Sequence, residues 1–119
     1  MLDKNNRIEY RIYPSVYDEI ILGNKNVEIR LLNEKSEKIK IGDKIRFQVV
    51  DNNLYLIVEV TNKYIYSDLD ELYENKDIVL NCVMNYTKEE CLNVLFQIFG
   101  KDKVLNSKLV GIEFKILSK

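Results

Sequence analysis

Residues 26–31 read Asn26-Val27-Glu28-Ile29-Arg30-Leu31, and apolar side chains alternate with charged ones from Val27 onward. This alternation is typical of a β-strand whose two faces meet different surroundings. Val27, Ile29 and Leu31 then face one way, while Glu28 and Arg30 face the other way. The strand is therefore predicted to pack its apolar face on a core and to present a charged pair on the opposite face.

Working outward from this strand, similar patterns predict further strands at residues 7–13, 45–50, 54–66 and 109–117, of which 54–66 is one long or bent strand. A helix is expected from Pro14 to Leu22, because proline suits a first helical turn and Gly23 suits the end of one. Further helices are expected after a Ser67 cap and over residues 87–99, where Gly100 stops the second. Residues after Leu31 are expected to form a polar loop, and residues 78–84 an extended segment.

These elements predict an α+β domain: a small β-barrel of about five or six strands with three short helices. The helices interrupt the strands irregularly, so a regular parallel sheet is not expected. The alternating faces and the helix stripe predict one shared core. We expect this core to contain Val27, Ile29, Leu31, Ile45, Phe47, Leu95, Val110, Ile112 and Phe114.

Composition limits the classes of protein that remain. The chain has 119 residues, 46% hydrophobic and 31% charged, which is typical of a single globular domain, here residues 1–119. The longest apolar run, Leu54 to Val58, is far too short to span a membrane, and the first residues do not resemble a secretory signal. We therefore expect a cytoplasmic protein with no membrane partner.

The chain has no histidine, which excludes every mechanism based on a Ser-His, Cys-His or His-metal arrangement. Cys82 and Cys91 are nine residues apart and lack the close pairing of a zinc site, so they are expected to be reduced core residues. We accordingly expect no metal and no cofactor.

Charge is unevenly distributed along a chain of net charge −1. Residues 25–46 contain seven basic and four acidic side chains, while residues 67–77 contain five acidic and one basic. The net charge argues against binding long DNA duplexes through charge alone. Two interpretations of the basic segment remain open, namely a locally basic binding face and an ordinary solvated surface.

The candidate site is the group Lys25, Glu28 and Arg30, with Arg46 as a neighbour on the next strand. If the charged face lines a cleft, Arg30 could bind a phosphate or base edge with its guanidinium fork, and Glu28 could orient Arg30 or accept from a base amino group. The alternative is a surface salt bridge between Glu28 and Arg30, worth less than about 1 kcal/mol. Tyr55 and Tyr86 are further candidates, for base stacking.

The order Gly-x-Lys-x-x-Glu-x-Arg at residues 23–30, followed by Ile41-Gly42-Asp43-Lys44-Ile45-Arg46-Phe47, resembles the signature of ASCH domains. The resemblance covers residues 7–117 and includes the closing Gly111-Ile112-Glu113-Phe114 strand. ASCH domains belong to the PUA-like superfamily. The resemblance implies a small PUA-like barrel whose cleft binds RNA or a modified nucleotide.

Some small ASCH proteins resemble acetylcytidine amidohydrolases, which use a lysine, a threonine nucleophile and a more distant glutamate. Lys25 matches that lysine, but Glu28 occupies the threonine position, and the distant glutamate falls near Met84-Asn85. We therefore expect no acetylcytidine hydrolysis at the level of those relatives. If the chain is an enzyme, Lys25 and Glu28 are the candidate catalytic residues; otherwise no catalytic residue is assigned.

Three functions remain open at this point. The first is a nucleic-acid-binding module for RNA or a nucleotide, the second is a small hydrolase acting on RNA or a modified nucleoside, and the third is a protein-interaction module. Convergence of Lys25, Glu28 and Arg30 on one concave pocket would favour a ligand, whereas a flat face would favour a protein partner. The oligomeric state is not predicted.

Overall fold

One curled sheet of five strands dominates the computed structural model, which describes residues 7–68, 71–72, 93, 96–97 and 99–118. Its strands are β1 (Ile8–Ile12), β2 (Val27–Leu31), β3 (Lys44–Val49), β4 (Tyr55–Tyr66) and β5 (Leu109–Ser118). They lie in the order β1-β3-β4-β5-β2. Only the β1–β3 pair among these is parallel, and the other pairs are antiparallel. The predicted α+β barrel is thus an open half-barrel.

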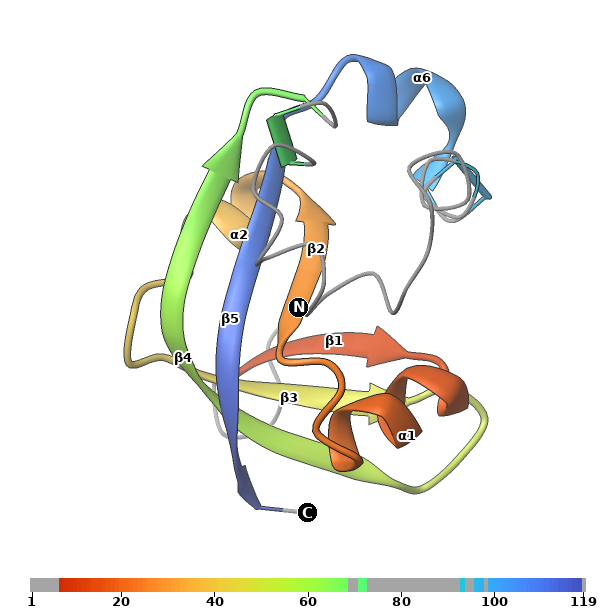
Figure 1. Ribbon diagram of the computed structural model, residues 1–119, viewed down its shortest axis with the longest axis vertical. Helices are drawn as coiled ribbons and strands as arrows, with labels where there is room; N and C mark the ends of the chain where they lie inside the picture. Colours follow the sequence, from red (N-terminus) through yellow and green to blue (C-terminus); the bar gives the residue numbers. More distant parts are fainter. Residues whose placement is uncertain (1–6, 69–70, 73–92, 94–95, 98, 119) are drawn as a thin grey trace.

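The sheet curls because β4 is long and bent. Its register against β5 shifts between Ile57 and Val58 and again between Val60 and Asn62. Such irregularities bend a strand and increase its twist. Figure 1 shows β4 and β5 curving along the height of the molecule, with β1 and β3 lying across their lower ends. The bend brings β1 and β2, the two edge strands, to the open side of the half-barrel.

Three helices have their bounds within the described residues: α1 (Pro14–Ile21), α2 (Glu34–Glu37) and α6 (Lys101–Leu105). The first confirms the expected helix, with Leu22 as its C-cap and Gly23 at a φ of 84°. This left-handed conformation favours glycine, so the chain turns there into β2.

The prediction of a polar loop after Leu31 was wrong. Residues 34–37 form a helical turn, held by a capping box in which the side chains of Asn33 and Ser36 each accept from the other's main-chain N–H. Helix α6, which begins directly after Gly100, was not expected either. At the start of the helical turn that contains Leu72, the side chain of Asp68 caps the N–H of Glu71, so Asp68 replaces the expected Ser67 cap.

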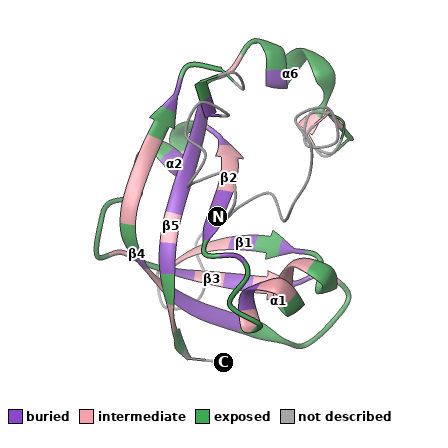
Figure 2. Cartoon of the chain, viewed as in Figure 1, coloured by how far each residue is buried: buried purple, intermediate pink, exposed green. Residues whose placement is uncertain are grey.

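The apolar residues form two clusters, not the single core expected. Residues 109 and 111 of β5 face one cluster, and residues 110, 112 and 114 face the other. Because side chains alternate along a strand, the two clusters lie on opposite faces of the sheet. Figure 2 shows buried positions along β2, β3 and β5.

The inner cluster lies in the hollow of the half-barrel, and its members include Tyr10, Ile12, Ile45, Phe47, Val58, Val110, Ile112 and Phe114. The outer cluster consists of Val27, Leu31, Tyr66, Leu72, Val104 and Leu109, with Ile29 packed against it. Leu95, Cys82, Cys91, Tyr86, residues 78–84 and most of the expected 87–99 helix lie outside the described residues.

Candidate functional site

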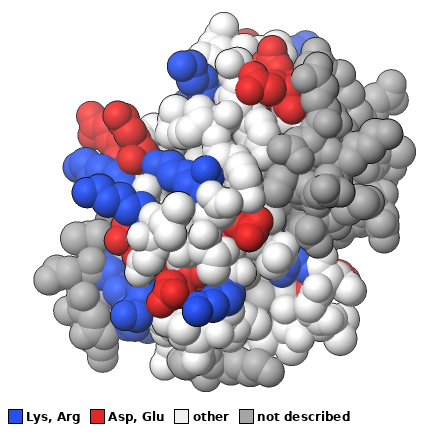
Figure 3. Space-filling model, turned by 60° about the vertical axis from the view of Figure 1, so that its left-hand side comes forward, with Lys and Arg blue, Asp and Glu red and all other residues white. Residues whose placement is uncertain are grey.

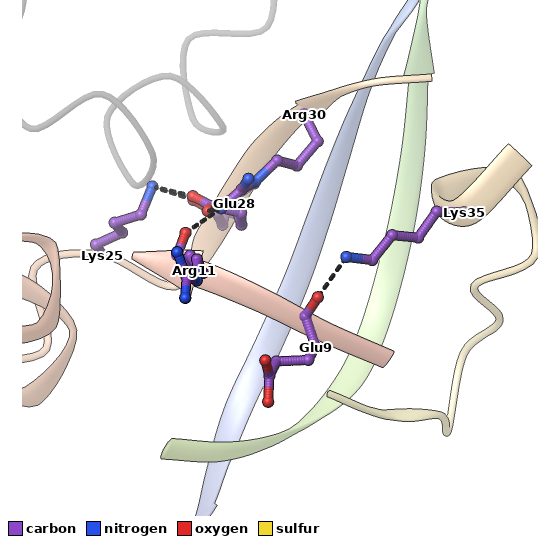
Figure 4. A network of polar contacts seen from close by, with 7 residues as sticks. Glu9, Arg11, Lys25, Glu28, Arg30 and Lys35 are labelled. Atoms are coloured by element: carbon purple, nitrogen blue, oxygen red, sulfur yellow. Dashed lines mark hydrogen bonds and ion pairs between the residues drawn. The ribbon is translucent and has the colours of Figure 1, made fainter. Parts of the chain in front are cut away.

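Glu28 is the centre of a buried ionic network on β2. Its Oε1 lies 3.2 Å from Lys25 Nζ, and its Oε2 lies 2.7 Å from Arg30 Nη2 and 3.1 Å from Arg30 Nε. Only 8% of Glu28 is exposed. Figure 4 shows the three side chains turned toward one another. The predicted group therefore comes together, and its burial rules out a simple surface salt bridge.

The register of the sheet explains why this charged pair is buried. Glu28 stands opposite Ile112, and Arg30 stands opposite Val110, both of which belong to the inner cluster. Directly opposed residues of antiparallel strands project from the same face. The charged face of β2 therefore points into the hollow of the half-barrel, while its apolar face packs on the outer cluster.

Glu28 is held as a carboxylate. Burial alone would raise its pKa, but the Lys25 ammonium and the Arg30 guanidinium act against it and hold the pKa of Glu28 below its ordinary value. Both carboxylate oxygens are already engaged by these cations. A carboxylate in this state is a weak base, so its main role is to fix the positions of Lys25 and Arg30.

Lys25 is held in position by the turn after α1. The main-chain N–H groups of Asn24 and Lys25 donate to the carbonyl of Glu19, at 2.9 and 3.3 Å. The side chain of Lys25 is 5% exposed, and its Nζ donates to the Val27 carbonyl at 2.8 Å. Lys25 therefore ties the beginning of β2 to the network.

Arg30 also reaches across the open side of the half-barrel. Its Nη2 donates to the main-chain carbonyl of Arg11 at 2.8 Å, and its guanidinium lies over the ring of Tyr10, 4.5 Å from the ring centre. We call this junction between the facing edges of β1 and β2 the seam. Arg30 thus connects the ionic network to β1.

Lys35 on α2 is a second cation at the seam, and it was not among the predicted site residues. Its Nζ donates to the Glu9 carbonyl and lies 4.2 Å from the centre of the Tyr10 ring. Burial and the charge of Arg30 lower the pKa of Lys35, partly offset by Glu9. The Asn33–Ser36 capping pair was the available signal, because it fixes the helical turn that carries this lysine.

Arg46 is not part of the network. It stands opposite Glu9 in the β1–β3 pair, and its Nε lies 3.4 Å from Glu9 Oε1. Its Nη2 donates to Gln48, and its guanidinium lies over the ring of Tyr55 at 4.0 Å. Because Tyr10 and Phe47 form the neighbouring opposed pair and face inward, Arg46 and Tyr55 lie on the outer side of the ribbon. The sequence-based grouping with Arg30 was too broad.

Two cavities open along the seam. The larger, about 760 Å³, is lined by Glu9, Tyr10, Arg11, Arg30, Leu31, Leu32, Asn33, Lys35, Phe99, Lys103 and Ser107. The smaller, about 330 Å³, is lined by Arg11, Ile12, Tyr13, Val16, Glu28, Ile29, Arg30, Val50 and Phe99. Arg11, Arg30 and Phe99 border both. The two cavities are therefore neighbouring parts of one cleft.

The larger cavity is electropositive. Among its described lining residues, Arg11, Arg30, Lys35 and Lys103 are basic and Glu9 alone is acidic. That carboxylate is paired with Arg46. In a chain with net charge −1, this local excess of positive charge favours an anionic ligand.

Neither a metal cluster nor a membrane helix was found in the described part of the chain. No group of three or more His, Cys, Asp or Glu side chains there could hold a metal ion. None of the helices there has the length and apolar character needed to cross a bilayer.

Comparison with known proteins gives a fold but no family. No family model matches the chain. Over 104 residues the chain is 32% identical to Endonuclease MutS2 of Borreliella burgdorferi. The matched segment covers 83% of this chain but only 13% of that protein. The chain thus spans a small fraction of this curated relative.

Solved structures resemble the chain along almost its whole length. The crystal structure of hypothetical protein PH0355 has a TM-score of 0.76 and 25% identity, covering 93% of this chain and 99% of the other. The solution structure of PF0455 from Pyrococcus furiosus has a TM-score of 0.72 and 27% identity, covering 95% and 99%. EF3133 from Enterococcus faecalis V583, described with the family-model DUF984, has a TM-score of 0.66 at 14% identity, covering 87% and 71%. The half-barrel is therefore shared with other small proteins.

Proposed function

We propose that this chain is a nucleic-acid-binding module that holds RNA or a single modified nucleotide in the cleft at the seam. The observation that supports it best is the larger cavity, whose described lining includes four basic residues and one acidic residue, Glu9, whose carboxylate is already paired with Arg46. Phosphate groups are the natural ligands of such a site, since Arg and Lys bind them through charge-assisted hydrogen bonds.

The extent of the positive charge favours a short or unpaired ligand. In the view of Figure 3, basic and acidic side chains lie side by side on the same face, which therefore carries both signs of charge. Duplex binding relies on many phosphate contacts along a basic surface. A cleft between two strands is better suited to one or a few unpaired nucleotides, which proteins bind by stacking and by hydrogen bonds to exposed edges.

The motif resemblance supports the same function. Lys25, Glu28 and Arg30 carry the ASCH-like signature, and these three side chains form the ionic network. We therefore extend the proposal to an ASCH domain of PUA-like type that acts in the cytoplasm. Of the motif, Asp43 has a local structural role, because its carboxylate accepts from the N–H of Lys40 in the turn before β3.

A hydrolase acting on RNA or a modified nucleoside is the second candidate, and the likeness to a segment of an endonuclease favours it. The state of Glu28 argues against it, since an ionised carboxylate with both oxygens engaged is poorly placed to act as a general acid or base. Efficient hydrolysis of RNA or acetylcytidine by the wild type, abolished in Lys25→Ala or Glu28→Gln, would establish the enzyme instead.

The binding proposal is tested by titrating labelled short single-stranded RNA with the full chain at several salt concentrations. Affinity should fall as salt rises, and Arg30→Gln should weaken binding more than Lys38→Gln or Lys40→Gln, whose lysines are exposed and outside the cleft. Equal losses in all three variants would indicate a diffuse basic surface. Undetectable binding at low salt would favour a protein-interaction module.

A further inference from the structure

Resting on the proposed function, we infer that the cleft contains a dedicated phosphate subsite, formed by Arg30, Lys35 and Lys103 beside Tyr10. The adjoining smaller cavity then receives the base of the same nucleotide. The ligand class is a nucleoside phosphate, either free or as one unit of an RNA chain. This assigns a role to three residues, Tyr10, Lys35 and Lys103, that the sequence motif does not include.

The spacing of two cations fits one phosphate group. Arg30 and Lys35 donate to the carbonyls of Arg11 and Glu9, which are alternate residues on the same edge of β1. Alternate residues of a strand are about 7 Å apart. Two oxygens of one phosphate can bridge donors at this separation, with hydrogen bonds of about 2.8 Å at each end.

Both cations retain unused donors. The guanidinium of Arg30 uses Nε and Nη2 in its bonds to Glu28 and Arg11, and its Nη1 has no hydrogen-bond partner in the described part of the chain. The ammonium of Lys35 has three N–H groups, one of which goes to Glu9. Lys103 lines the same cavity and forms no ion pair with the described residues. A phosphate would therefore meet several free N–H donors without displacing the network.

The Tyr10 hydroxyl is the second, independent sign of a ligand. Tyr10 is only 6% exposed, it lines the larger cavity, and its Oη has no hydrogen-bond partner among the described residues. Buried hydroxyls are nearly always hydrogen-bonded, so an unpartnered one on a ring that two cations overlie is unusual. A phosphate oxygen held by Arg30 and Lys35 would be an acceptor for it.

The smaller cavity has the character of a base pocket. Its lining includes the apolar side chains of Ile12, Val16, Val50 and Phe99, together with the carboxylate of Glu28. Planar rings bind well between apolar and aromatic side chains, and a carboxylate accepts from an exocyclic amino group. Arg30 borders both cavities, so the base and the phosphate of one nucleotide would lie on either side of it.

The test measures, by calorimetry or NMR titration of the full chain, the affinities for the four ribonucleosides, their 5′-monophosphates and inorganic phosphate. We expect at least one monophosphate to bind about tenfold or more tightly than its nucleoside, and more tightly than inorganic phosphate. Lys35→Gln and Lys103→Gln should lower the affinity for the monophosphate to about that of its nucleoside. Tyr10→Phe, which removes only the hydroxyl, should reduce it, and Lys38→Gln is the matched control with no expected effect.

The outcomes separate the two proposals. If RNA or nucleosides bind but the phosphate adds nothing, or Lys35→Gln and Lys38→Gln behave alike, the phosphate subsite is wrong and the binding function stands. If inorganic phosphate binds as tightly as every monophosphate, the base pocket is wrong. If neither RNA nor any nucleotide binds, the proposed function itself fails. Thermal melts of each variant exclude loss of folding as the cause.

Discussion

Arg30 on β2 donates a 2.8 Å hydrogen bond from Nη2 to the main-chain carbonyl of Arg11 on β1, while the same nitrogen lies 2.7 Å from Glu28. One guanidinium therefore holds together the two edges of the half-barrel and the buried ionic network. The sheet is joined at this point by side chains, not by a strand-to-strand ladder. The stability of the fold and the shape of the cleft consequently depend on the same residues.

Glu28→Gln should destabilise the protein by about 3–5 kcal/mol at neutral pH, because it leaves two cations around a neutral group. Glu28 has a folded-state pKa below its ordinary value of 4.5, so its contribution is present above that pH and is lost as the pH falls through the folded-state pKa. Urea unfolding between neutral pH and pH 3 should therefore show the difference between wild type and variant shrinking in acid.

Glu59→Gln is the matched control for that experiment. Its partner Lys115 lies 3.5 Å away, and the side chains are 31% and 60% exposed, so the loss should be below about 1 kcal/mol. A Glu28→Gln variant as stable as Glu59→Gln at neutral pH would contradict the account of a buried, obligatory network.

The phenol of Tyr10 should ionise at a higher pH than an ordinary tyrosine. Burial raises its pKa to about 12, with Arg30 acting to lower it and Glu28 to raise it. Because the folded-state pKa lies above the ordinary value of 10.0, stability from Tyr10 is complete below pH 10 and declines as the pH rises toward 12. Ultraviolet titration of phenolate should lose a step near pH 12 in Tyr10→Phe, which at neutral pH should be at least as stable as wild type. A Tyr10→Phe variant with an unchanged titration would contradict this assignment.

Phe47 should be the most costly position in the inner cluster. It is fully buried and meets the ring of Phe114 edge-on, with centroids 5.2 Å apart. Phe47→Ala should lower the free energy of unfolding by about 3–5 kcal/mol. Leu54→Ala, at a position 46% exposed, should change it by no more than about 0.5 kcal/mol in the same denaturation assay.

Gly111→Ala should destabilise by about 1–3 kcal/mol through crowding on the outer face of the sheet. An added Cβ would lie 3.3 Å from a ring carbon of Tyr66 and 3.4 Å from Ile29. Combining Gly111→Ala with Tyr66→Leu should recover part of this loss. Additive effects of the two changes in thermal melts would show that Tyr66 is not the obstacle.

The strands were predictable because each has an environment that differs between its two faces. The alternation of apolar and charged residues predicted the bounds of β2 to within one residue, and the glycine after α1 predicted where that helix ends. Helices α2 and α6 were missed because each is about one turn long, too short to show an apolar stripe. A single core was predicted instead of two clusters, because a single sequence does not show that both faces of β5 are buried.

The site was predictable only where its residues are close in sequence. Lys25, Glu28 and Arg30 come together because one turn and one strand carry them. Tyr10 and Lys35 join them through the curl of the sheet, which no local pattern encodes. Arg46 was wrongly grouped with Arg30, because the face of the sheet from which Arg46 projects depends on the register between β1 and β3, which the sequence does not show.

The occupied carbonyls of the seam also bear on self-association. An exposed strand edge is a template on which a second chain can add its own strand, and sheet proteins commonly obstruct such edges with charge. Here Lys35 and Arg30 occupy the outward carbonyls of β1 at Glu9 and Arg11, and Lys25 and Ser36 occupy those of β2 at Val27 and Leu31. Two cations that line the cleft, Arg30 and Lys35, thus also obstruct the free edge of β1 against the addition of a strand from a second chain.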